Sequence, residues 1–194
     1  FPNTMSVFAK LAKMQHYGLP TRLLDVTQNL LVALYFACRQ DNAHKDDIGM
    51  IEVYIVQKNE VKRHDDREVA LISSLAKCTY SSFQSDEWKR ELKAHSGMAD
   101  ISDDEVETTS KKILFVLPEL NNERIKIQSG AFILFGASRN KEMPKIKSYE
   151  CVRFYIDKKV KLQIIQQLKI MGISDSILFP ELEICMKDIK SQFM

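Results

Sequence analysis

Two parts of the sequence place polar side chains of chemically useful types inside otherwise apolar segments. An arginine can bind an anionic group and a carboxylate can stabilise a developing positive charge. A ligand site is usually a mostly apolar pocket with a few convergent polar groups. We therefore predict one concave pocket formed by six residues: His16, Tyr17, Thr21, Arg22, Asp25 and Gln128.

The first of these residues also have structural interpretations, which the sequence leaves open. His16 can cap the last carbonyl groups of a helix that ends at Gly18, and Tyr17 can pack over the same turn. Arg22 and Asp25 flank two leucines, so pairing with each other or with backbone groups is as reasonable as a ligand contact.

Three further residues can be interpreted either as part of a ligand site or as purely structural residues. Tyr35 lies in a run of nine apolar residues, where its hydroxyl could reach a cavity, although such a tyrosine is usually core with one hydrogen bond; Phe36 is expected to be core. Gln128 and Gly130 can mark the start of a strand at which glycine is needed for backbone geometry.

The motifs of several other enzyme classes are missing from the sequence. It contains no Gly-x-Ser-x-Gly, no His-Glu-x-x-His and no phosphate-binding glycine loop. The acidic run from residue 100 to 107 lacks the spacing of a calcium-binding loop and is expected to face solvent. We predict no metal site, and we expect His44, His64 and His95 to be surface residues.

Composition points to an ordinary globular domain. Of 194 residues, 45% are hydrophobic and 28% are charged, and the formal net charge of +2 is too small to indicate nucleic acid or membrane as a partner. The basic residues Lys158, Lys159 and Lys161 are expected at a solvated helix start. Four cysteines without Cys-x-x-Cys spacing, no apolar run long enough to span a membrane and no export signal favour the cytoplasm.

Hydrophobic periodicity predicts an α+β fold. Helices are expected at residues 5–16, 28–39, 160–171 and 182–189, and a helical region at 67–95 is expected in two parts, 69–76 and 83–92. Asn3 or Thr4 can cap the first helix, and Thr27 can cap the second, which we expect to be buried on nearly all sides. Strands are expected at 50–56, 113–117, 131–135 and 151–156. Because strands and helices do not alternate regularly, we predict one mostly antiparallel or mixed central sheet flanked by helices.

Three blocks of sequence resemble the FRG domain family. Residues 15–37 read QHYGLPTRLLDVTQNLLVALYFA and resemble its QHYG and LPTRLLD-x-T signature. Residues 124–132, RIKIQSGAF, and 168–182, LKIMGISDSILFPEL, are similar to its later elements. The resemblance implies a single FRG-type domain over residues 1–194. The Phe-Arg-Gly element of the family does not occur here, so we expect the chain to lack an N-terminal segment.

The order of these elements also resembles that of ADP-ribosyltransferases, which implies a split sheet with a cleft and NAD as a substrate. In that resemblance Thr21 and Thr27 belong to the nicotinamide-pocket segment, while Gln128 stands where those enzymes have a carboxylate. Asp25 or Glu123 would then supply the carboxylate. The remaining NAD contacts implied are His16, Tyr17, Arg22, Tyr35 and Arg124.

Two functions follow from the resemblance. The first is an NAD-using ADP-ribosyltransferase-like toxin or defence effector, with a protein or nucleic-acid acceptor and a partner or inhibitor protein. The second is a catalytically silent module that binds a nucleotide, RNA or protein. Glutamine at position 128 favours the second, whereas the threonine-rich turn favours the first.

Overall fold

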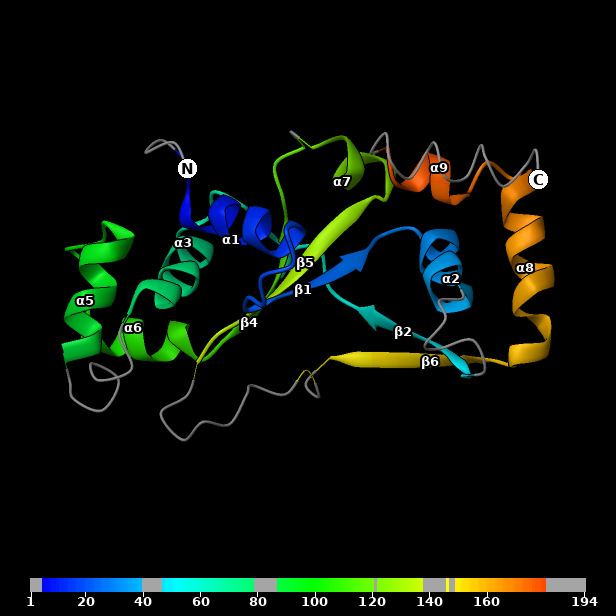
Figure 1. Cartoon of the computed structure of the whole chain (residues 1–194). Helices are drawn as coiled ribbons and strands as arrows, with labels where there is room; N and C mark the ends of the chain where they lie inside the picture. The colour runs from blue at the N-terminus through cyan, green and yellow to red at the C-terminus, as the bar shows by residue number, and fades with distance from the viewer. Residues whose placement is uncertain are drawn as a thin grey trace. The chain divides into compact units, whose positions relative to one another are not determined.

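The structure is a computed structural model that describes residues 5–39, 47–78, 87–120, 122–137, 146 and 149–180. Its contacts divide the chain into two compact units (Figure 1). Unit 1 consists of Phe1–Asp25, Val56–Glu119 and Ala131–Ser148. Unit 2 consists of Val26–Ile55, Leu120–Gly130 and Tyr149–Met194. Each unit is therefore assembled from segments that are distant in the sequence.

Unit 1 begins with helix α1 (Val7–His16), which has a defined start and end. The Oγ atom of Ser6 accepts a hydrogen bond from a first-turn N–H at 3.1 Å, so Ser6 is the N-cap. The prediction of Asn3 or Thr4 as the cap was wrong, because the helix begins at Val7, two residues later than predicted. Gly18 has a φ of +85°, the left-handed conformation that ends a helix, as predicted.

A four-stranded mixed sheet contributes most of its residues to unit 1. Its strand order is β1-β5-β4-β3; β3 and β4 are parallel, whereas β4 and β5 are antiparallel. Strands β4 (Ile113–Leu117) and β5 (Gly130–Phe135) were predicted from the sequence. Strands β1 (Leu23–Thr27) and β3 (Lys62–Arg63) were not. In β5 the four residues from Ala131 to Leu134 are buried in succession, as expected for a strand covered on both faces.

Helix α3 (Arg67–Ser74) lies at the centre of the helices of unit 1. It contacts α1, α5 (Glu87–Ser96) and α6 (Asp103–Ser110), and the short helix η1 (Leu75–Lys77) continues it. The acidic run supplies the first turn of α6, where its exposed carboxylates interact favourably with the positive end of the helix dipole. Val106 in the same run is fully buried, because the helix turns one side toward the core.

Unit 2 is built around a two-stranded antiparallel sheet. Strand β2 (Gly49–Ile55) pairs with β6 (Glu150–Ile156) along its whole length (Figure 1). Helix α2 (Leu30–Cys38) contacts both β2 and α8 (Lys158–Ile170), whereas the short helices α7 (Glu123–Ile127) and α9 (Asp175–Leu178) contact each other. The four strands predicted from the sequence therefore exist, but they belong to two sheets and not to one central sheet.

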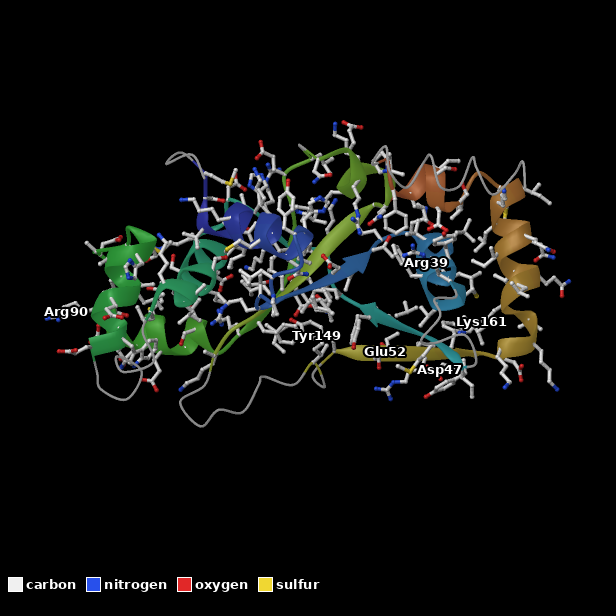
Figure 2. The ribbon with its side chains drawn as sticks, viewed as in Figure 1. Arg39, Asp47, Glu52, Arg90, Tyr149 and Lys161 are labelled. Atoms are coloured by element: carbon white, nitrogen blue, oxygen red, sulfur yellow. The ribbon has the colours of Figure 1, made fainter. Side chains whose placement is uncertain are left out.

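Two burial predictions for unit 2 were wrong. Helix α2 buries Val32, Tyr35 and Cys38 but leaves Leu30 56% exposed and Phe36 41% exposed, so only one side faces the core. Lys161 is not part of a solvated helix start. It is 3% exposed and lies on the side of α8 nearest α2 (Figure 2), because this position of the helix points its long aliphatic stem inward.

The described residues confirm an α+β fold with one mixed and one antiparallel sheet, both flanked by helices. The helix predicted at 182–189 lies outside the described residues, and so do residues 83–86 of the helix predicted at 83–92. No helix among the described residues has both the length and the apolar character to cross a membrane.

A close backbone approach in unit 1 makes Gly136 essential for stability. A Cβ atom at this position would lie 2.0 Å from the carbonyl oxygen of Ser110 and 2.7 Å from that of Lys112. We predict that Gly136→Ala lowers the free energy of unfolding by about 3 kcal/mol, because backbone atoms must move apart. Gly130→Ala is the control, since its nearest contact would be an ordinary 3.4 Å. Equal denaturation midpoints for the two variants would contradict this packing.

Candidate functional site

The turn after α1 displays an aromatic pair at the surface of unit 1. His16 and Tyr17 are both exposed, Tyr17 by 75%, and their rings meet edge to face with centroids 5.2 Å apart. Leu19 in the same turn is 53% exposed. The tyrosine is thus presented outward and not packed into the core, which is the arrangement expected of a contact residue.

Gln15 connects this turn to the start of β1. Its Nε2 donates a hydrogen bond to Oδ2 of Asp25 at 2.9 Å, and its Oε1 accepts one from the hydroxyl of Thr21. The Thr21 oxygen in turn accepts from the backbone N–H of Leu23 at 3.2 Å. Both ends of the amide are therefore used, and the Asp25 carboxylate is held by the residue that precedes His16. The sequence analysis missed Gln15, although it opens the QHYG motif.

The side chain and the backbone of Arg22 are both hydrogen-bonded to β5 in the sheet of unit 1. Its Nη1 donates to the carbonyl oxygen of Phe135 at 3.1 Å, and its own carbonyl oxygen accepts from the Phe135 N–H at 3.0 Å. Burial lowers the pKa of the Arg22 guanidinium from its usual value. The predicted alternative in which Arg22 pairs with backbone groups is thus the one observed. Asp25, by contrast, is exposed and bound to Gln15.

Thr27 and Gln128 meet in unit 2. The Thr27 hydroxyl donates to the carbonyl oxygen of Gln128 at 2.7 Å and accepts from the Asn29 N–H at 3.0 Å. A third hydrogen bond joins the Gln28 N–H to the Ser129 carbonyl oxygen at 2.9 Å. The N-cap of α2 is Asn29 and not Thr27 as predicted, because the hydroxyl of Thr27 is used one step earlier in the turn.

The side chain of Gln128 also has a structural partner. Its Nε2 donates to the carbonyl oxygen of Leu178 at 2.9 Å. The next residue, Ser129, has a φ of +48°, a conformation uncommon for a residue other than glycine. The strained position is therefore Ser129. The prediction that Gly130 is required by backbone geometry was wrong, because a side chain at 130 would meet only ordinary contacts.

Tyr35 is buried, whereas Arg124 is partly exposed. Tyr35 is 2% exposed and belongs to a core cluster with Val32, Leu168 and Phe179. The guanidinium carbon of Arg124 lies 4.7 Å from the ring centroid of Phe179. A second arginine, Arg39, occupies the same distance from this ring and was not identified from the sequence; it ends a helix, where a basic residue is commonly read as a cap.

The structure thus gathers the predicted site residues into two groups. Unit 1 contains five of them: His16, Tyr17, Thr21, Arg22 and Asp25. Unit 2 contains Thr27, Tyr35, Arg124 and Gln128. Convergence of both groups on one pocket stays a prediction. Among the described residues, no three histidine, cysteine or acidic side chains are grouped so that they could hold a metal ion.

Comparison with known families agrees with the first sequence block. Residues 2–46 match the FRG domain, so this part of the chain is similar to that family. The match contains α1, β1 and α2, together with Gln15, Thr21 and Asp25. Neither a curated protein nor a solved structure matches the chain.

The bond from Gln128 to Leu178 predicts a stability cost for a carboxylate at position 128. In Gln128→Glu the donated hydrogen bond is lost and a negative oxygen faces a carbonyl oxygen. We expect the free energy of unfolding to fall by about 1–3 kcal/mol in urea denaturation at neutral pH. The exposed Gln166 on α8 provides the control Gln166→Glu, for which a change of less than about 0.5 kcal/mol is expected. A fully stable Gln128→Glu protein would show that the bond contributes little.

Proposed function

We propose that the chain is an ADP-ribosyltransferase-like domain that uses NAD, with Asp25 as its catalytic carboxylate. The observation that supports this most strongly is the exposed Asp25 carboxylate, which is hydrogen-bonded to Gln15, the residue that precedes the exposed ring pair of His16 and Tyr17. The match of residues 2–46 to the FRG domain includes all four residues. The preferred architecture remains a split sheet with a cleft.

The proposed reaction breaks the bond between nicotinamide and the ribose of NAD. The bonding electron pair leaves with the nicotinamide, which departs neutral, and positive charge develops on the ribose. A carboxylate held close to that charge lowers the barrier. A nucleophilic group of the acceptor then bonds to the ribose carbon, and Asp25 accepts the proton that the acceptor loses. The acceptor is proposed to be a protein or a nucleic acid, as for a toxin or defence effector.

The surroundings of Asp25 fit a flat heterocycle. The edge-to-face ring pair of His16 and Tyr17 offers aromatic surface on which nicotinamide can stack. Thr21 lies within the same hydrogen-bonded group, through its bond to Gln15. Arg22 contributes through the position of β1, since its guanidinium is bound to a backbone carbonyl.

A second function is a silent module that binds a nucleotide, RNA or a partner protein. It is favoured by Gln128, which carries no charge and whose amide is already bonded to Leu178. Both functions use the exposed turn, so they differ only in whether Asp25 performs chemistry. An inhibitor protein that covers the turn is compatible with either.

The catalytic proposal predicts a large effect of a small change at Asp25. We expect Asp25→Asn to reduce nicotinamide release from NAD by at least about 100-fold, because charge stabilisation of the ribose is lost. The amide still offers an oxygen to Gln15, so the denaturation midpoint should stay close to that of the parent protein. Nicotinamide is quantified by chromatography after incubation of the full chain with NAD and cell extract.

The control is Asp104→Asn, an exposed carboxylate of α6 whose replacement should leave nicotinamide release unchanged. Equal release by the Asp25→Asn and parent proteins would remove Asp25 from the reaction. No release by the parent protein, together with measurable NAD binding, would favour the silent module.

Both proposed functions predict that the exposed Tyr17 contributes to the binding of NAD. Tyr17→Ala should leave stability within about 0.5 kcal/mol of the parent, because the side chain is 75% exposed. It should weaken NAD binding roughly 10-fold, since a stacked aromatic contact contributes about 1–1.5 kcal/mol. Isothermal titration measures the affinity, with Tyr17→Phe as the variant that should retain it. Unchanged affinity of Tyr17→Ala would exclude the stacking contact.

A further inference from the structure

Strand β6 of unit 2 has one edge without a hydrogen-bond partner. Its seven residues pair with β2 in an unbroken antiparallel register, and these two strands form a sheet of their own (Figure 1). Alternate backbone N–H and C=O groups of a strand point to opposite sides, so one set faces β2 and the other faces away from it. Among the described residues, the groups of β6 that face away from β2 make no hydrogen bond.

This strand also lacks the features by which proteins protect a free edge. Such edges are usually short, interrupted by a bulge, or supplied with proline and lysine. Strand β6 has no bulge in its register and contains neither proline nor lysine. Its basic residue, Arg153, is held across the sheet, where its Nε donates a hydrogen bond to Glu52 at 2.7 Å. An unprotected edge of this length is a template for another strand.

Apolar side chains of β6 are exposed on both faces of the sheet. Ile156 is buried in a core cluster with Cys38 of α2. Val152 and Phe154 lie on the same face of the strand as Ile156, yet they are 42% and 49% exposed. Tyr155 lies on the opposite face and is 68% exposed. Apolar side chains gathered along a free edge indicate a contact with another chain.

The residues of β6 are complementary to a second copy of the same strand. When two copies pair antiparallel about a two-fold axis at Phe154, this ring lies opposite the same ring of the second copy. Arg153 then lies opposite Tyr155 of the second copy, where a guanidinium and an aromatic ring attract each other. Val152 lies opposite Ile156 of the second copy, which is a favourable apolar pair.

Neighbouring registers with the same symmetry are less favourable. An axis at Arg153 places two positive charges directly opposite each other. An axis at Val152 places the Phe154 ring opposite the Glu150 carboxylate. The charges and rings of the strand therefore favour the axis at Phe154. They also favour a second copy over an unrelated strand, because both members of every favourable pair come from β6 itself.

We propose that two copies of this chain associate through β6, so that their two-stranded sheets join into one continuous antiparallel sheet. A two-stranded sheet is only marginally stable by itself, and joining two of them satisfies the backbone groups of both free edges. The seam is short, so we expect a weak dimer whose population depends on concentration. The dimer is independent of the proposed reaction with NAD, because no residue of the seam belongs to the turn at residues 15–25.

Sedimentation velocity of the full chain over a concentration series tests the dimer. The parent protein should shift from monomer to dimer as its concentration rises. In Phe154→Lys two positive charges replace the apolar pair at the axis, so we expect the dissociation constant to rise at least about 10-fold. Met50→Lys is the matched control, since Met50 is 51% exposed on β2 and does not belong to the seam. It should dimerise like the parent protein, and circular dichroism checks that both variants are folded.

A mixture of the Phe154→Lys and Phe154→Glu proteins tests the register. Opposite charges then meet at the axis, so the mixture should dimerise more tightly than either variant alone. A parent protein that stays monomeric at every concentration would overturn the dimer and leave the edge to a strand of a different protein. A dimer that Phe154→Lys leaves unchanged would exclude β6 as the seam. A weakened dimer that the mixture does not restore would overturn the pairing at Phe154.

Discussion

The arrangement of unit 2 depends on the two hydrogen bonds made by Gln128. Its carbonyl oxygen accepts from the hydroxyl of Thr27, and its side-chain amide donates to the carbonyl oxygen of Leu178. These three residues come from the three separate blocks of sequence that resemble the FRG domain. One glutamine therefore ties together segments that are about fifty and one hundred residues away from it. Its backbone carbonyl is the acceptor, and its side-chain amide suits this position because the NH2 group can donate to a carbonyl oxygen.

That constraint changes the roles of the polar residues in the motifs. Thr27, Gln128 and Arg22 are the residues whose spacing most suggests chemistry, yet each is bonded to a backbone group. Side chains committed in this way define where the strands begin and are poorly placed to contact a ligand. The turn with Tyr17 and the carboxylate of Asp25 remain exposed, and the proposed chemistry depends on these two features.

Local sequence patterns predicted most of the elements but not their assembly. The helices α1, α2 and α8 were found because their apolar spacing and stop signals are local. Strands β1 and β3 were missed, since one contains Asp25 and the other has two residues, too few for any alternation. Division into two sheets could not be predicted, because pairing between β2 and β6 joins residues about a hundred positions apart.

The same limit applies to the site. Sequence patterns suggested Asp25, Tyr17 and Arg124 as candidates. They did not suggest Gln15, whose amide is bonded to the Asp25 carboxylate, or Arg39, which lies over the Phe179 ring. Both omissions are residues whose role arises from a neighbour in space. Lys161 and Phe36 were misjudged for a related reason, since burial depends on which side of a helix meets the core.

Hydrogen exchange of the full chain with and without NAD tests most directly whether the exposed turn is the ligand site. The account predicts slower exchange of backbone amides in residues 16–25, where the aromatic pair and Asp25 lie, and no change in helix α6 of the same unit. Slower exchange confined to other segments, with residues 16–25 unaffected by saturating NAD, would contradict it.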